Sequence, residues 1–151
     1  AKAWMGELTD VGCAALILIH DLDRNPSNHT LNDEAELRGR LAQIPVPCGV
    51  AHHICIPVEE VEAWFWSCPT ALERVAPGQG NSRAKPSPHL LPKPKEALIK
   101  LSAAQHGGKA RYTTGQNPEL AALLDLELCA SRCPSFRDLR SFVIDSVASA
   151  A

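Results

Sequence analysis

The feature that most constrains this chain is a short apolar run that ends abruptly in two aspartates. Residues 14–19 contain only alanine, leucine and isoleucine, and Asp21 and Asp23 follow directly after His20. A short run rich in isoleucine and leucine, followed by polar residues, is typical of a buried strand in a parallel sheet. Ligands of open α/β sheets bind just outside the carboxyl ends of the strands. The two aspartates therefore stand where a binding site is expected.

The spacing of the two aspartates suggests a metal site. Residues two apart point to the same side of an extended segment, so Asp21 and Asp23 can aim at one spot. Adjacent carboxylates repel each other unless a proton or a cation lies between them. A few hard oxygen ligands, with room for water and phosphate, suit Mg²⁺. The alternative is structural, because aspartate often caps a turn or a helix.

Composition limits the class of protein. The chain has 151 residues, of which 45% are hydrophobic and 21% charged, as expected for one globular domain. Its net charge of −2 excludes a global basic field for nucleic acid. No Cys-x-x-Cys pair occurs among the six cysteines, which disfavours a zinc site. The run at 14–19 is too short for a membrane span, and too short and too late for a signal peptide, so we expect a cytoplasmic protein without a membrane partner.

Hydrophobic periodicity and turn residues divide the chain into alternating elements. The second expected strand covers 52–58, so the order strand, helix, strand predicts a right-handed parallel crossover. Residues around 76–92 are rich in proline, glycine and serine, and are expected to form a loop. The expected helices cover 2–10, 34–43, 59–66, 69–75, 96–105, 118–128 and 135–149.

A second acidic cluster lies at the junction between the expected strand 52–58 and the helix after it. Glu59, Glu60 and Glu62 stand there together. In the first turn of a helix each stabilises the helix dipole by roughly 0.3–1 kcal/mol, which accounts for one or two of them. Glu59 and Glu62 are three residues apart and would share a helix face. Because the junction follows a neighbouring strand end, it can stand next to the two aspartates.

Two tryptophans, Trp64 and Trp66, accompany these glutamates. Residues two apart cannot lie on the same helical stripe. We therefore expect one of them in the core and the other on the surface, as a partner contact or a stacking platform.

Four elements in order resemble a bacterial Toprim-like family of unassigned function. They are the sequence Asp21-Leu22-Asp23-Arg24 after a hydrophobic strand, the string from Ile56 to Trp64 with its Glu-Ala-Trp, the pair Pro94-Lys95, and Ser135-Phe136 before the last helix. The resemblance extends from about Val11 to Val143. It implies an α/β, Toprim-like fold, with a parallel sheet flanked by helices and extra C-terminal helices.

The same resemblance implies a metal-dependent nuclease. Members of the family are often encoded beside ABC- or SMC-like ATPases, and such pairs are suspected of defence against phage or other foreign DNA. The implied partners are thus a nucleic acid substrate and an ABC/SMC-like ATPase. Toprim domains also carry a glutamate on a strand upstream of their Asp-x-Asp strand, and this sequence shows neither. We therefore expect residues 1–151 to be a single Toprim-like domain that lacks its first strand and helix.

In the expected mechanism, Asp21, Asp23 and Glu62 bind Mg²⁺ or Mn²⁺. The metal clamps the scissile phosphate and lowers the pKa of a bound water. Glu62 completes the ligand set or orients that water, with Glu59 as its substitute.

Basic residues complete this expected site. Lys95, or Lys93 in its place, neutralises charge that develops on the phosphate. Arg24 holds a phosphate oxygen in a charged hydrogen bond, and Lys93 is a second candidate for this role. All three can equally be solvated surface residues.

Two other functions stay open. One is a non-catalytic Toprim-like module that binds and regulates an ABC/SMC-like ATPase through the Trp64/Trp66 region or the last helix. The other is a phosphatase with Asp21 as its nucleophile, which the absence of a serine or threonine directly after the acidic motif disfavours.

Overall fold

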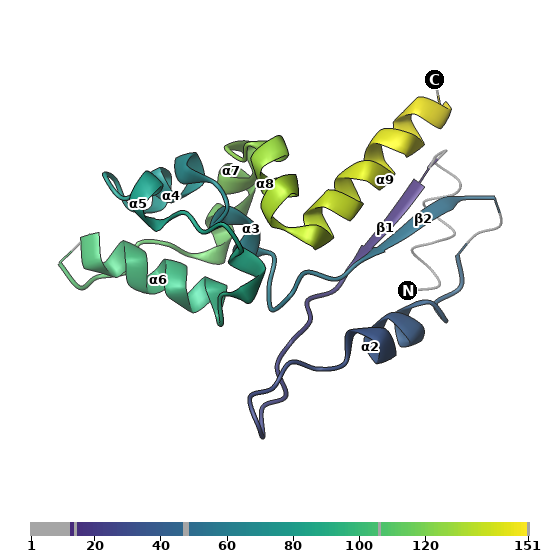
Figure 1. The fold of residues 1–151 in the computed structure, drawn as a ribbon, viewed down its shortest axis with the longest axis horizontal. Helices are drawn as coiled ribbons and strands as arrows, with labels where there is room; N and C mark the ends of the chain where they lie inside the picture. Colours follow the sequence, from purple (N-terminus) through teal and green to yellow (C-terminus); the bar gives the residue numbers. More distant parts are fainter. Residues whose placement is uncertain (1–12, 14, 47–48, 106, 151) are drawn as a thin grey trace.

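The computed structural model describes residue 13 and residues 15–46, 49–105 and 107–150, and its architecture is mixed α/β. A small parallel sheet lies toward one end of the molecule, and most of the helices gather at the other end (Figure 1). The expected helix over 2–10 lies outside the described residues. The helical elements are α2 (Glu34–Leu41), α3 (Glu62–Phe65), α4 (Pro69–Val75), α5 (Gly80–Arg83), η1 (Pro88–Leu90), α6 (Pro94–Gln105), η2 (Thr114–Gln116), α7 (Asn117–Ala122), α8 (Leu126–Arg132) and α9 (Pro134–Ala150).

The sheet consists of β1 (Ala15–Ile19) and β2 (Ala51–Cys55), which pair in parallel over their whole length. The helix between them, α2, begins where Asp33 accepts a hydrogen bond from the backbone of Glu36 at 3.0 Å, as expected of an N-cap. The predicted order of strand, helix and parallel strand is thus confirmed.

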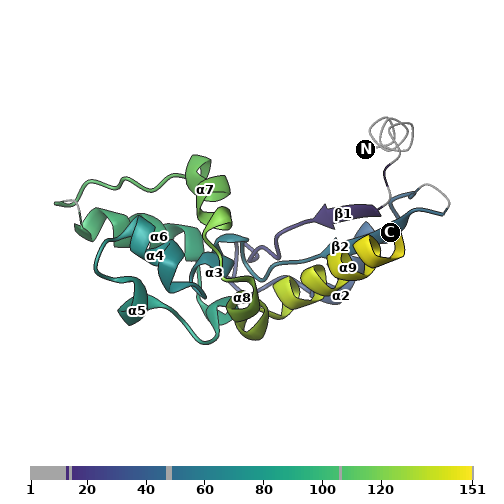
Figure 2. The same cartoon turned by 90° about the horizontal axis from the view of Figure 1, so that it is seen from above.

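A small core lies at the carboxyl ends of the strands. Below the sheet, Leu37 of α2 packs with Leu22 and Ile56, which follow β1 and β2. The other face of β2 meets α9, which runs beside the sheet in both views (Figures 1 and 2). There the ring of His53 stacks on Phe142 with centroids 5.2 Å apart.

The larger core belongs to the helical part of the molecule. Its centre is formed by side chains that are almost fully buried, with Leu72 and Leu98 both at 0% exposure. The cluster brings together residues of α3, α4, α6 and α7 with the segment before η2. Its buried members are Phe65, Trp66, Cys68, Ala71, Leu72, Val75, Leu98, Tyr112 and Leu120.

The segment expected to be a loop, around 76–92, contains α5 and η1. Its composition is that of a loop, but the carboxylate of Glu73 orders it by accepting hydrogen bonds from the backbones of Gly78, at 2.6 Å, and Gly80, at 3.0 Å. Gly80 also lies so close to the Pro69 carbonyl that an added Cβ would stand 2.4 Å from it. Glycine is required there because no larger residue fits.

Two expected helices differ from the observed ones by more than two residues at one end. The prediction of a single helix over 118–128 is wrong, because α7 ends at Ala122 and a new helix, α8, follows. Asp125 caps α8 by accepting a hydrogen bond from the Leu128 N–H at 2.9 Å. The helix expected to begin at Glu59 begins at Glu62 instead. Glu59 has φ of 65°, a left-handed conformation that no helix residue can adopt.

The described cysteines form no disulfide, and within that part of the chain no helix is both long and apolar enough to cross a membrane.

We predict that Leu72→Ala lowers the free energy of unfolding by about 2–5 kcal/mol, because it leaves a cavity in the larger core. Leu90→Ala is the control, since that side chain is 72% exposed. Urea denaturation followed by circular dichroism measures both changes. Equal, small losses in the two variants would contradict the packing described for α4.

Candidate active site

Backbone pairing continues beyond the sheet and brings the two acidic segments together. The Leu22 N–H donates to the Pro57 carbonyl at 2.8 Å, and the Glu59 N–H donates to the Leu22 carbonyl at 3.2 Å. Leu22 and Val58 form an isolated parallel bridge. The aspartates on either side of Leu22 therefore lie beside residues 59–62.

Asp21 is the residue most affected by this crowding. Partial burial and the neighbouring carboxylates of Glu62, Asp23 and Glu60, in that order, raise its pKa from 3.8 to about 6. A hydrogen bond from the backbone of Val61 partly opposes the shift in pKa. Four carboxyl groups thus act on one another at the ends of the strands, and Asp21 can exchange a proton near neutral pH.

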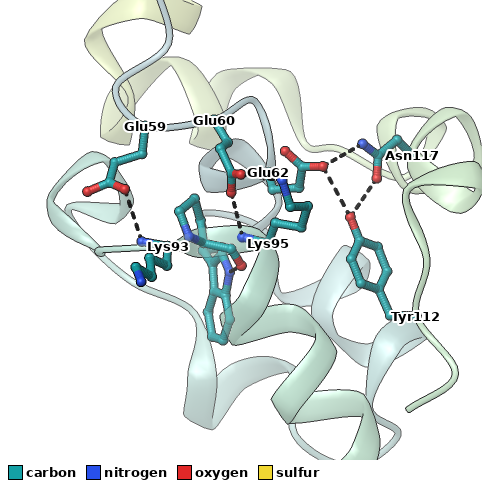
Figure 3. A network of polar contacts seen from close by, with 9 residues as sticks. Glu59, Glu60, Glu62, Lys93, Lys95, Tyr112 and Asn117 are labelled. Atoms are coloured by element: carbon teal, nitrogen blue, oxygen red, sulfur yellow. Dashed lines mark hydrogen bonds and ion pairs between the residues drawn. The ribbon is translucent and has the colours of Figure 1, made fainter. Parts of the chain in front are cut away.

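Glu59 connects this region to the segment before α6. Its side chain is almost fully buried, with the residue 6% exposed. One carboxylate oxygen pairs with the guanidinium of Arg24, and the other accepts from the backbone of Lys93 at 3.1 Å (Figure 3). Both Glu59 and Lys93 have positive φ, 65° and 51°. Two left-handed residues therefore meet through one carboxylate.

Glu60, the next residue, connects to the same segment in a similar way. It accepts from the backbone of Lys95 at 3.0 Å and from the ammonium group of the same residue at 2.5 Å (Figure 3). The hydrogen bond to Glu60 is the main reason that the pKa of Lys95 is raised. Lys95 therefore stays protonated, and its positive charge is balanced by the Glu60 carboxylate.

Glu62 is held by neutral donors. It is 4% exposed, and one carboxylate oxygen accepts from Asn117 Nδ2 at 2.9 Å and faces the Tyr112 hydroxyl at 3.5 Å (Figure 3). That hydroxyl donates to Asn117 Oδ1 at 2.7 Å. Burial and the Glu62 charge raise the pKa of Tyr112, so it stays protonated. The network fixes the Glu62 carboxylate without neutralising it.

The carboxylates thus fall into two groups. Within the described residues, no ion pair involves Asp21, Asp23 or Glu62, whereas Glu59 and Glu60 each pair with a basic side chain. The charges of the second group are therefore balanced by basic side chains, and those of the first group are not balanced by any described residue.

The donor set fits magnesium only in part. In the part of the chain that the structure describes, no three Asp, Glu, His or Cys side chains are grouped closely enough to hold one metal ion. Mg²⁺ commonly binds one or two carboxylates and keeps several waters and substrate phosphates. Asp21 with Glu62 or Asp23 supplies that smaller number of hard oxygen ligands. The arrangement therefore suits a hydrated ion.

The structure places the predicted basic residues close to this site but in different environments. The Arg24 guanidinium and the Lys95 ammonium are paired with glutamates. Lys93 is exposed, and its ammonium group makes no contact to the described residues that qualifies as an ion pair. Of the three, Lys93 is the one free to meet a phosphate.

The partners of Glu62 could not be predicted from the sequence. Neither Asn117 nor Tyr112 belongs to a motif or spacing that points to Glu62. Both lie 50 or more residues from Glu62 along the chain. The one available signal is that Tyr112 is the single tyrosine of the chain.

Fold and site together define a mixed α/β protein with a partly unpaired carboxylate cluster at the ends of two parallel strands. Residues 11–143 match the family described as Domain of unknown function (DUF4276), and the chain belongs to that family. No curated protein and no solved structure matches the chain.

We predict that the stability of Asp21→Asn relative to the wild type increases as the pH rises from acidic to neutral. Because the pKa of Asp21 is raised to about 6 on folding, folding favours its protonated form, and the contribution of Asp21 to stability is lost as pH rises from about 3.8 to about 6. The amide has no such dependence. Melting temperatures in EDTA across this range measure the difference.

Asp145→Asn is the matched control, an exposed carboxyl on α9. It should change the melting temperature by the same amount at every pH. A loss of stability in Asp21→Asn that is equal at both ends of the range would show that Asp21 is a structural cap.

Proposed function

We propose that this protein is a Toprim-like, metal-dependent nuclease that hydrolyses phosphodiester bonds of nucleic acid, as the effector of an ATPase-coupled defence system. The observation that carries the proposal is the position of Asp21, Asp23 and Glu62. They come from two different segments, which are paired beyond the carboxyl ends of the parallel strands, and they have no ion-pair partner among the described residues.

Electrostatics favours a cation at this position. Carboxylates that crowd one another are stabilised when a proton or a cation lies between them. The raised pKa of Asp21 reflects the same crowding. A divalent ion removes the repulsion at neutral pH more completely than a single proton does.

The chain's own residues have separable roles in this proposal. When bound, Mg²⁺ or Mn²⁺ supplies charge neutralisation at the phosphate and a water of lowered pKa. Asp21, with Asp23, holds the ion, and Glu62 either holds it or orients the water. Tyr112 and Asn117 keep the Glu62 carboxylate in place.

Lys93 is the basic residue best placed to hold the phosphate in this proposal. Its backbone is anchored by Glu59, while its side chain extends into solvent. Arg24 and Lys95 act on the phosphate only if substrate displaces their glutamate partners. Their first role is to neutralise Glu59 and Glu60.

We predict that the double variant Asp21→Asn, Asp23→Asn cleaves nucleic acid at least about 100-fold more slowly than the wild type, since loss of a metal's ligands removes its stabilisation of the transition state. Plasmid and single-stranded DNA, incubated with Mg²⁺ or Mn²⁺ and the candidate ATPase, are the substrates. Gel electrophoresis measures the rate.

Asp145→Asn is again the control and should cleave at the wild-type rate. The proposal is wrong if the wild type does not cleave under these conditions, or if the double variant is folded and cleaves as fast as the control.

A second candidate function is a non-catalytic module that binds and regulates the ATPase. The observation that favours it is the exposed apolar surface of α9, where Val143, Ile144 and Val147 are 40%, 49% and 65% exposed. The tryptophans give it less support. Trp66 is buried and donates to the Pro94 carbonyl at 3.1 Å, and Trp64 packs edge-on against Phe136.

We predict for this second function that Ile144→Asp, Val147→Asp prevents binding to the candidate ATPase, because it places two charges on an apolar contact surface. Light scattering of the mixed proteins measures the complex. Leu90→Asp, at an exposed apolar residue elsewhere, should leave it intact. Binding that survives the double substitution would exclude α9 as the contact.

A further inference from the structure

A cavity on the far side of Tyr112 is not used by the site described above. It has a volume of about 290 Å³ and opens between α4, the segment before η2, and α7. This volume is near the lower end of small-ligand pockets, roughly 300–1,000 Å³. The lining residues are Arg74, Val75, Pro77, Arg111, Tyr112, Gln116 and Leu120.

The polar side chains at the rim have donors to offer and almost no acceptors. The Arg111 guanidinium makes no hydrogen bond or ion pair to a described residue. Arg74 uses Nε to pair with Glu119 at 2.6 Å, which leaves its two terminal nitrogens. Gln116 uses Oε1 to accept from the Thr113 backbone at 3.0 Å, which leaves its NH₂ group. Because Glu119 already balances the charge of Arg74, the positive charge at the rim without a partner among the described residues is that of Arg111. A ligand that satisfies these donors is rich in acceptors and carries negative charge toward Arg111.

The floor of the cavity is apolar. Val75, Tyr112 and Leu120 are 7%, 4% and 1% exposed, and Pro77 completes the wall. Pro77 is the exposed apolar residue of the lining, so a flat ring would contact mainly Pro77, while arginine forks match phosphate oxygens. The Gln116 amide is placed to donate to ring nitrogens or carbonyls.

We propose that this cavity binds one nucleotide unit, its phosphate on Arg111 and the terminal nitrogens of Arg74, and its base against Pro77. The base must be unpaired to enter, so the preferred substrate is a single strand. Here the inference rests on the proposed function, because the nucleotide is taken to belong to the strand that is cleaved. The Tyr112 hydroxyl contacts Glu62, so the bound nucleotide lies one side chain away from the carboxylate cluster.

Binding without cleavage tests the inference. Fluorescence anisotropy of a short labelled single-stranded oligonucleotide, in EDTA, gives the affinity of each variant. Arg111→Gln and Arg74→Gln should each bind about tenfold more weakly, with a smaller salt dependence. Arg40→Gln is the matched control, since this exposed arginine of α2 also has a glutamate neighbour, Glu36, at 4.0 Å. It should bind as the wild type does.

Further arms identify the ligand. A blunt duplex should bind about tenfold more weakly than the single strand. AMP should displace the strand from the wild type, whereas residual strand binding by Arg111→Gln should resist it. Wild-type affinity in Arg111→Gln, or equal affinity for duplex and single strand, overturns the inference. AMP binding that requires Arg111, without strand binding, overturns the substrate-strand assignment and leaves a free nucleotide as the ligand.

Two results distinguish the nucleotide site from the nuclease activity. Strand binding that depends on Arg111, in a protein that does not cleave, refutes the nuclease and supports the nucleotide site. Cleavage that requires Asp21, with strand binding unaffected by Arg111→Gln, refutes the nucleotide site and supports the nuclease.

Discussion

The candidate site depends on two backbone hydrogen bonds that lie outside the sheet. The bonds from Leu22 to Pro57 and from Glu59 to Leu22 extend the parallel register past the last residues of β1 and β2. Leu22 is also part of the small core below the sheet. The backbone of Leu22 therefore fixes the spacing of the two acidic segments, and its buried side chain holds both segments against the small core.

The same register gives the glutamates at the strand ends different roles. Glu59 and Glu60 accept backbone hydrogen bonds from Lys93 and Lys95, at the start of α6, and so attach the helical core to the ends of the strands. Charged acceptors make such bonds stronger than neutral ones. Glu62 accepts a hydrogen bond from Asn117 and has only neutral partners. Three glutamates within four residues thus have three different surroundings.

Features that depend on near neighbours could be predicted from the sequence. The strand expected over 14–19 and the helices expected over 34–43 and 96–105 each follow from a local pattern, and each is present as β1, α2 and α6. The position of Asp21 beside the glutamates could also be predicted, because parallel strand ends share one edge of a sheet. Other features could not. The left-handed conformation of Glu59 depends on contacts with Arg24 and Lys93, which are distant in sequence.

The break between α7 and α8 was missed because periodicity alone continued across it. The capping aspartate, Asp125, lies inside an otherwise helical pattern. The partners of Glu62 were missed for a related reason, since a hydrogen bond between residues 55 positions apart leaves no periodic trace.

The conformation of Glu59 has a consequence for how this protein can vary. A left-handed backbone at a residue other than glycine costs about 1–3 kcal/mol, and glycine would remove that strain. Glycine would also remove the carboxylate that joins Arg24 to the backbone of Lys93. At position 59, relief of backbone strain and retention of the contacts to Arg24 and Lys93 therefore require different residues. A redesign that scores each residue by its own backbone preference would choose glycine there and would remove one of the two glutamates that link the strand ends to the start of α6.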